Sequence, residues 1–106
     1  MNLRGTLPTL ILEALALHPD HGYSIAQRIK ERSRGVLDFK EGTLYPALHK
    51  LEQGGWVKAE WRQTENNRRA KFYSLTRPGK KALRKETDEW FRLSEAITHV
   101  VNLTEA

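Results

Sequence analysis

The chain contains no cysteine, so disulfides, iron–sulfur clusters and zinc sites built on cysteine are excluded. It also has no apolar run near the roughly 18 residues that a membrane-spanning helix requires. Its amino terminus lacks the basic cluster, apolar stretch and small-residue cleavage site of a secretory signal. We therefore expect a cytoplasmic protein with no membrane partner.

Motifs for catalysis are missing as well. The sequence has no nucleophile motif, no phosphate-cradling glycine loop and no dinucleotide fingerprint. His18 and His21 are three residues apart, but they flank a proline-containing loop and have no third ligand at a convincing spacing. The sequence predicts neither an enzyme nor a bound metal or other cofactor.

What the chain does contain is sufficient for one globular domain. It has 106 residues, of which 39% are hydrophobic and 29% are charged. The net charge of +5 is unevenly distributed, since residues 58–85 contain ten Lys/Arg and only two Asp/Glu. This concentration indicates a polyanionic partner, although a well-solvated basic face is the alternative when charge is considered alone.

Two helices are predicted in the amino-terminal third. Thr6 is placed to cap the first helix, with Pro8 in its first turn. Residues 18–22 break this helix, and the second is predicted from about Tyr23 to Arg32. The apolar face of the first helix consists of Leu7, Leu10, Ile11, Ala14 and Leu15.

The most informative segment is residues 41–57. Pro46 is tolerated only in the first turn of a helix, so a third helix should begin near Gly42 or Thr43. Gly54 tolerates the backbone that ends a helix, as does the glycine after it. The inner, apolar face is formed at helical spacing by Leu44, Leu48 and Leu51. The outward, polar face is formed by Thr43, Pro46, His49, Lys50 and Gln53.

A β-hairpin is predicted next. Residues 57–63 alternate strictly, which is typical of a half-buried strand with Val57, Ala59 and Trp61 on its apolar face. Residues 64–69 form a polar turn, because asparagine accepts a positive φ more readily than most residues. The return strand covers residues 70–75, so the hairpin has a basic tip.

A last helix should follow, capped by Thr76 and ending at about Val101. Leu83, Trp90 and Ile97 are seven residues apart, a spacing typical of a helix that packs along another helix at a shallow angle. The chain has little core of its own for so long an apolar stripe to cover. We therefore expect the stripe to be a contact between subunits.

Three motifs resemble those of the PadR-type transcriptional regulators: His21-Gly22-Tyr23-Ser24-Ile25, Glu41-Gly42-Thr43-Leu44-Tyr45-Pro46, and Lys71-Phe72-Tyr73-Ser74-Leu75-Thr76 followed by Gly79. The Gly-Thr-Leu-Tyr-Pro block is specific, because a generic winged helix lacks its Tyr-Pro pair. The resemblance covers roughly residues 3–85, and the single closing helix is similar to that of the short subclass. Two wing positions differ from the family pattern: Asn67 replaces a common glycine and Arg69 a common proline. We expect Asn67 to preserve the turn and Arg69 to strengthen contact with phosphate.

The resemblance implies a mainly α fold. Residues 1–76 would form a winged helix-turn-helix with a two-stranded β-wing, and residues 77–106 a C-terminal dimerisation helix within the same compact domain. Family members are dimeric repressors that use the third helix and the wing on DNA. The expected function is sequence-specific binding of a homodimer to double-stranded DNA at a pseudo-palindromic operator, with repression relieved by an effector.

The candidate DNA-binding residues are Thr43, Tyr45, Pro46, His49, Lys50, Arg68, Arg69 and Lys71. Thr43 and Tyr45 lie at the opening of the third helix, where hydroxyls and free N–H groups donate to phosphate. The alternative for these two is a cap and a partly buried ring. His49 can equally fill a polar gap, whereas the basic hairpin tip favours phosphate or minor-groove contact.

The candidate dimer residues are Leu7, Leu10 and Ile11 of the first helix, with Leu83, Trp90, Ile97 and Val101 of the last. Trp90 and Phe91 are also candidates for an inter-subunit pocket that takes a small, flat aromatic effector. Packing at the dimer seam is the alternative for these two rings.

Two other functions remain open. A winged-helix protein-interaction module without sequence-specific DNA binding would need an exposed apolar patch on the third helix, where the sequence places polar residues. Sequence-indifferent binding of nucleic acid such as RNA would need exposed aromatic rings for base stacking. Most aromatic residues of this chain fall in apolar patterns, which argues against it.

Overall fold

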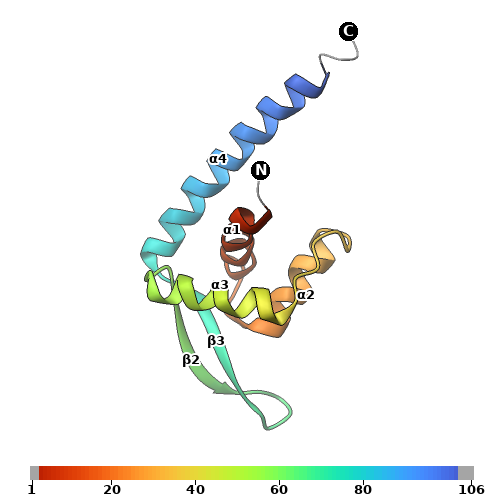
Figure 1. Ribbon diagram of the computed structural model, residues 1–106. Coiled ribbons are helices and arrows are strands. Elements are labelled where there is room, and N and C mark those ends of the chain that lie inside the picture. The colour runs from red at the N-terminus through yellow and green to blue at the C-terminus, as the bar shows by residue number, and fades with distance from the viewer. Residues whose placement is uncertain (1–2, 103–106) are drawn as a thin grey trace.

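The computed structural model describes residues 3–102, with side chains from Thr6 onward. Three short helices form a body, from which a β-hairpin projects at one end and a long helix at the other (Figure 1). The predicted mainly α winged helix-turn-helix is confirmed. The elements are α1 (Leu3–Leu15), β1 (Asp20–His21), α2 (Gly22–Arg32), α3 (Glu41–Gln53), β2 (Val57–Gln63), β3 (Arg69–Leu75) and α4 (Arg77–Asn102).

The core lies where α1, α2 and α3 meet the base of the sheet. Its aliphatic side chains recur at helical spacing on each helix, so each helix contributes one apolar face. The predicted inner face of α3 is confirmed, because all three of its leucines are buried. The core residues are Leu7, Ile11, Leu12, Ala14, Leu15, Ile25, Ile29, Leu44, Leu48, Leu51, Val57 and Tyr73.

Three residues predicted for the dimer interface are used by the chain's own core. Leu7 is 2% exposed and Ile11 is completely buried, so neither has surface left for a partner. Leu83 of α4 is half-buried and packs against the same core. The prediction is wrong for Leu7 and Ile11, because the apolar face of α1 is turned toward α2 and α3. Leu10, which is only half-buried, stays a candidate.

The sheet has three strands in the order β1-β3-β2, whereas the sequence predicted two. β2 and β3 pair antiparallel from Val57↔Leu75 to Gln63↔Arg69, and these bounds match the predicted hairpin closely. The additional strand, β1, pairs Asp20 with Tyr73 and His21 with Phe72. A strand of two residues shows no alternation, so no periodicity could have predicted it.

The wing turn has the predicted conformation at Asn67, whose φ is +60°. The Thr64 N–H donates to the Arg68 carbonyl at 2.6 Å, and the Asn67 N–H donates to the Thr64 carbonyl at 3.0 Å. The Asn67 side-chain oxygen also accepts a 3.0 Å hydrogen bond from the Gln63 amide. Asparagine therefore supports this turn in the place of glycine.

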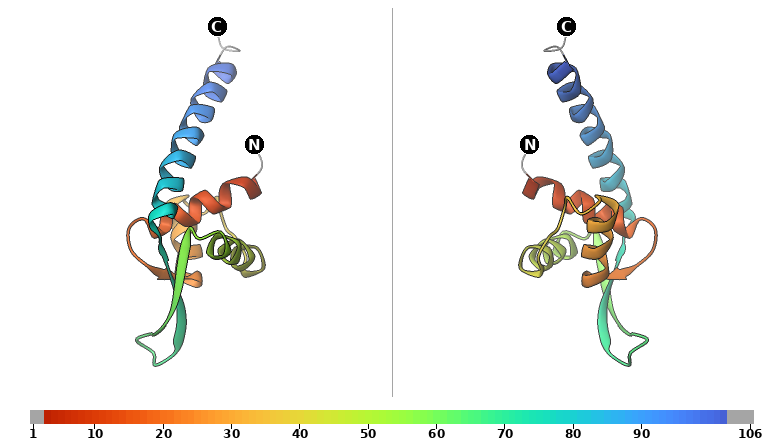
Figure 2. Two further views of the ribbon diagram at one scale, coloured as in Figure 1. Left: turned by 90° about the vertical axis from the view of Figure 1, so that its left-hand side faces the viewer. Right: turned by 90° about the vertical axis from the view of Figure 1, so that its right-hand side faces the viewer.

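Two local predictions are wrong. α1 begins at Leu3, so Thr6 lies inside the helix instead of capping it, and Pro8 lies beyond the first turn. The apolar face of β2 is buried only near the body, because Val57 is 2% exposed whereas Trp61 is 60% exposed. The outer half of the hairpin extends past the core into solvent (Figure 2).

The junction between the wing and α4 is tightly packed. The Thr76 hydroxyl accepts a 3.1 Å hydrogen bond from the Gly79 N–H, which confirms Thr76 as the cap of the last helix. The same hydroxyl donates to the Gly55 carbonyl at 2.6 Å. A Cβ atom at Gly79 would collide with the Trp56 carbonyl, so glycine permits the close approach. These contacts fix the start of α4 to the end of α3.

Candidate nucleic-acid interface

The two helices of the helix-turn-helix, α2 and α3, are packed together where the Tyr45 ring lies against Gly22. A Cβ atom at Gly22, the first residue of α2, would lie 2.6 Å from the Tyr45 ring on α3. The ring is nevertheless 41% exposed, so it packs on α2 with one part and reaches solvent with another. Burial, with the negative charge of Glu41, raises the pKa of Tyr45 and keeps its hydroxyl a neutral donor. Tyr45 is therefore a partly buried ring, and contact of its exposed part with DNA stays a prediction.

The outward face of α3 is polar, as predicted. Pro46 and His49 lie opposite the buried leucines and are exposed. Thr43 and Lys50 are also exposed and flank this face on the side of α1, where they border a broad depression of about 870 Å³. An exposed apolar patch, as a protein-interaction module would need, is not formed by these side chains.

The arginines of the wing are arranged in different ways. Arg68 lies exposed in the turn. Arg69 is exposed at the start of β3, and its guanidinium lies 5.5 Å from the centre of the Trp61 ring. Arg62 lies 5.2 Å from the Phe72 ring and donates to Glu60 at 2.6 Å. Arg62 was not among the sequence candidates, because alternation alone does not show how far a strand leaves the body.

Lys71 differs from the two arginines at the tip. Its ammonium donates to the Glu52 carboxylate of α3 at 3.1 Å, and this contact raises the pKa of Lys71. The ammonium also lies 5.6 Å from the centre of the Tyr73 ring. The pair joins the wing to α3 and neutralises the lysine charge. The predicted phosphate contact of Lys71 therefore has a competitor within the chain.

A polar network fixes the start of α2 against α1. Asp20 is 7% exposed and accepts hydrogen bonds from the His21 N–H at 2.9 Å and the Ser24 hydroxyl at 2.6 Å. Arg28 lies 3.1 Å from the same carboxylate and also donates to the Ala14 carbonyl. Burial alone would raise the pKa of Asp20, but these hydrogen bonds and the Arg28 charge hold it below 3.8. Asp20 was not predicted, although its partners His21, Ser24 and Arg28 all lie within the next eight residues of the chain.

Several aromatic side chains are more exposed than their sequence patterns indicated. Tyr23, Trp61 and Phe91 are 59%, 60% and 64% exposed, so the argument from buried aromatics was wrong. The three rings lie on α2, the wing and α4, and Arg69 covers part of Trp61. They do not form a row on which successive bases of a single strand could stack.

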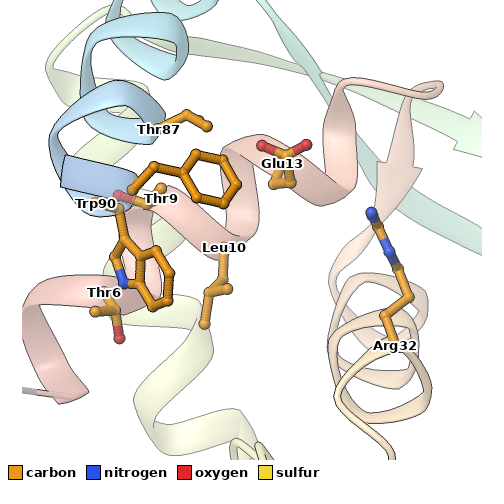
Figure 3. A pocket seen from close by; sticks show the side chains of 8 residues that line it. Thr6, Thr9, Leu10, Glu13, Arg32, Thr87 and Trp90 are labelled. Carbon is orange, nitrogen blue, oxygen red and sulfur yellow. The ribbon is translucent and has the colours of Figure 1, made fainter. Parts of the chain in front are cut away.

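A cavity of about 340 Å³ lies between α1 and α4 and reaches the end of α2 (Figure 3). Trp90 and Phe91 contribute to its wall, together with Leu10 of α1. Glu13 and Arg32 add one charge of each sign. Trp90 and Phe91 therefore line the same cavity. This cavity lies within a single chain, whereas the sequence predicted a pocket between subunits.

The outer half of α4 carries the predicted stripe on an uncovered surface. Trp90 is 39% exposed, Ile97 45% and Val101 57%, and Leu93 and Val100 beside them are also exposed. The helix projects away from the body over this half (Figures 1 and 2). Trp90 is partly covered, because it shares the cavity wall with side chains of α1, whereas Ile97 and Val101 lie further along the projecting helix.

Among the described helices, none combines the length and the apolar character needed to cross a bilayer. Within the described part of the chain, no three His, Cys, Asp or Glu side chains are grouped to hold a metal ion.

A polar helix beside a basic hairpin, mounted on a helix-turn-helix, defines the class of winged-helix DNA-binding regulators. Residues 11–85 match the sequence profile of the transcriptional regulator PadR-like family, so the chain belongs to this family. The family consists of transcriptional regulators, which confirms the prediction that the protein is not an enzyme.

Individual relatives agree with this assignment. The chain is 30% identical over 95 residues to an uncharacterized protein of Lysinibacillus sphaericus, covering 90% of this chain and 87% of that one. It is 30% identical to a transcriptional regulator of known structure from Clostridium thermocellum, with a TM-score of 0.82 over 92% of this chain and 91% of the other. A PadR family transcription regulator from Clostridium difficile is also 30% identical, with a TM-score of 0.79 over 92% and 99% of the two chains.

Proposed function

We propose that this PadR-family regulator binds a pseudo-palindromic operator as a homodimer and represses transcription until an effector releases it. One observation carries the proposal: the exposed polar face of α3 lies next to a basic wing, to which α3 is joined by the Lys71–Glu52 contact, while the Tyr45–Gly22 contact packs α3 on α2. A helix of this kind fits the major groove, while the hairpin reaches the adjacent backbone or minor groove.

The candidate residues divide into two roles. Thr43, Tyr45, Pro46 and His49 would face base edges or the nearest phosphates from α3, and Lys50 the backbone beside them. Arg68, Arg69 and Lys71 would contribute the sequence-independent attraction of the wing. The wing, residues 57–75, contains five Lys/Arg and two Asp/Glu, and this excess of positive charge supports its role.

The homodimer would form through α4. The stripe at Trp90, Ile97 and Val101 is exposed in the single chain and has the seven-residue spacing of a helix seam. We assign residues 77–106 to this contact and residues 1–76 to DNA. Leu10 remains available at the edge of the cavity as the contribution of α1.

The effector would enter the cavity beside Trp90 and Phe91. The space of about 340 Å³ is within the range of small-molecule sites and suits a flat aromatic compound. Because α1 and α4 form opposite walls, such a compound would change the angle of α4 to the body. That angle sets the separation of the two α3 helices in the dimer, so the compound would shift the population away from the DNA-binding form.

The proposal is tested by isolating genomic fragments that the purified protein retains, and then titrating the shared site against a scrambled duplex. We expect half-sites about one helical turn apart and an affinity that falls steeply with salt, because counterions are released from neutralised phosphates. Replacing Arg68, Arg69 and Lys71 together with alanine should weaken binding to both duplexes and flatten the salt dependence. Equal binding by parent and triple variant at about 150 mM salt would refute the role of the wing.

A reporter gene placed behind the recovered site tests the direction of regulation. Repression requires lower expression when the protein is present. Higher expression would make the protein an activator, while leaving DNA binding intact.

A further inference from the structure

One face of the wing carries a stacked pair that the fold does not require. Antiparallel partners share a face of the sheet, so Trp61 and its partner Lys71 point to the same side. Lys71 reaches Glu52 of α3, and that side is therefore the one turned toward α3. Arg69 lies diagonally across from Trp61, with its guanidinium 5.5 Å from the ring centre.

Trp61 does little for the core, because 60% of its side chain is exposed and the hairpin has left the body at this point. Its contact with Arg69 has a different consequence. A guanidinium that lies on an aromatic face keeps the N–H groups along its edge available, in the planar fork that matches two phosphate oxygens. The indole thus gives the Arg69 guanidinium a partner within the wing before any ligand arrives.

The opposite face of the same hairpin carries a second stacked arginine with the reverse properties. Arg62 lies over Phe72, but the Glu60 carboxylate already pairs with its guanidinium. Arg69 has no ion pair with an acidic side chain among the described residues. Of these two arginines, Arg69, on the side of α3, is therefore the one whose positive charge is available to bind an anion.

If α3 lies in the major groove, the face of the wing that is turned toward α3 is the one nearest the DNA strand that borders this groove. We propose that Arg69, held over the Trp61 ring, binds a phosphodiester of this strand, with Trp61 as its positioning residue. Lys71 joins the wing to α3 through Glu52, and this ion pair competes with its proposed contact with DNA. This inference rests on the proposed binding of duplex DNA, and it assigns a role to a residue that no charge pattern singles out.

The experiment uses a fluorescein-labelled duplex of random sequence, about 30 base pairs or three helical turns long, because phosphate contacts do not depend on sequence. Binding of the full chain is followed by anisotropy. Arg69→Ala should weaken binding about tenfold, as expected for one charge-assisted contact. Trp61→Ala should weaken it about threefold, through loss of the stack.

Coupling between the two residues distinguishes a positioned arginine from two separate contacts. The Trp61→Ala, Arg69→Ala double variant should bind as Arg69→Ala does. Arg69→Lys, which keeps the charge but lacks the planar fork, should lose about threefold with the parent's melting temperature. Arg62→Ala on the opposite face is the matched control and should change affinity less than twofold, since that guanidinium is already paired.

The proposal is overturned if Arg62→Ala weakens binding as much as Arg69→Ala, or if the two losses in the double variant simply multiply. Tryptophan fluorescence adds an independent measurement: duplex should change a signal that the parent has and Trp61→Phe lacks. A larger change with single-stranded oligothymidine would mean that Trp61 stacks on bases, and would also overturn the proposal. Failure of the parent to bind any duplex would refute the proposed function itself.

Discussion

At the scale of single residues, the placement of α2 depends on one buried carboxylate. Asp20 accepts from the His21 N–H and the Ser24 hydroxyl and pairs with Arg28, which also donates to the end of α1. The cap of α2 is His21, whose Nδ1 accepts a 3.3 Å hydrogen bond from the Ser24 N–H, and Asp20 holds both of these residues where the chain turns from β1. Gly22, the first residue of α2, lies against the Tyr45 ring of α3. The network around Asp20 therefore also influences the position of α3.

Replacement of Asp20 by asparagine should lower the stability of the protein in a pH-dependent way. The pKa of Asp20 is held below 3.8 in the folded chain, so its ionised form stabilises the fold above the unfolded pKa. This contribution is lost as the pH falls from near 4 through the folded pKa. Asp20→Asn should therefore cost about 1–3 kcal/mol at pH 7 and progressively less toward pH 3. Denaturant unfolding at both pH values measures the difference.

Glu95→Gln is the matched control for this prediction, because its carboxylate pairs with His99 at the exposed surface of α4. It should leave the stability nearly unchanged at both pH values. If Asp20→Asn lowers the free energy of unfolding equally at pH 7 and pH 3, the carboxylate charge does not stabilise the fold, and only the shape of the side chain matters.

At the scale of whole elements, α3 was the most predictable part of the chain and β1 the least. The leucine spacing and the two closing glycines are local, so they predicted the bounds of α3 to within about two residues. Pro46 was expected in the first turn but is the sixth residue of the helix, so that part of the prediction was wrong. β1 is defined only by its pairing with β3, more than fifty residues later in the chain. Contacts of this range leave no mark on local periodicity.

The same distinction applies to the candidate sites. Exposure of the outward face of α3 followed from its period, and this part of the prediction held. Periodicity showed that one face of α1 is apolar, but it could not show which element covers that face. The face was therefore assigned to a partner subunit, whereas α2 and α3 of the same chain cover most of it. The ion pair between Lys71 and Glu52 and the stack of Arg69 on Trp61 join segments whose register only the structure provides.

The two roles proposed for α3 can be separated by comparing two duplexes. Tyr45→Ala and Thr43→Ala should each cost more affinity on the operator than on random DNA, because contacts with base edges discriminate and phosphate contacts do not. One lost bidentate-type contact corresponds to about 1–3 kcal/mol of discrimination. Titration of both duplexes at one salt concentration measures the ratio.

Leu48→Ala is the control for this comparison, since Leu48 is fully buried on the inner face of the same helix. It should cost about 2–5 kcal/mol of folding stability and lower the melting temperature without favouring either duplex. An equal loss of affinity on both duplexes for Tyr45→Ala and Thr43→Ala would reduce these residues to backbone anchors.

At the scale of the whole molecule, the elongated shape and the exposed apolar stripe of α4 favour association with a second subunit. The chain extends over 59 × 28 × 22 Å because the wing and α4 leave the body in opposite directions. Apart from Trp61, the outer half of the wing exposes mainly polar side chains, as an element facing water or DNA should. The outer half of α4 instead exposes a continuous apolar stripe, which in a monomer would be a liability for aggregation.

Replacement of Trp90 and Ile97 by glutamate should convert the protein to a monomer. Two like charges would enter the seam of the paired α4 helices, whereas the core, to which these positions contribute little, would remain intact. Sedimentation should show a dimer for the parent and a monomer for the variant at micromolar concentration, with the far-UV helical signal largely retained. Because dimerisation sets the distance between the two α3 helices, the variant should bind a single half-site about as well as the parent but lose its preference for the palindrome. Glu86→Gln, lower on α4 and outside the stripe, should alter neither property. A parent that sediments as a monomer would contradict the homodimer and, with it, the proposed action of an effector through the angle of α4.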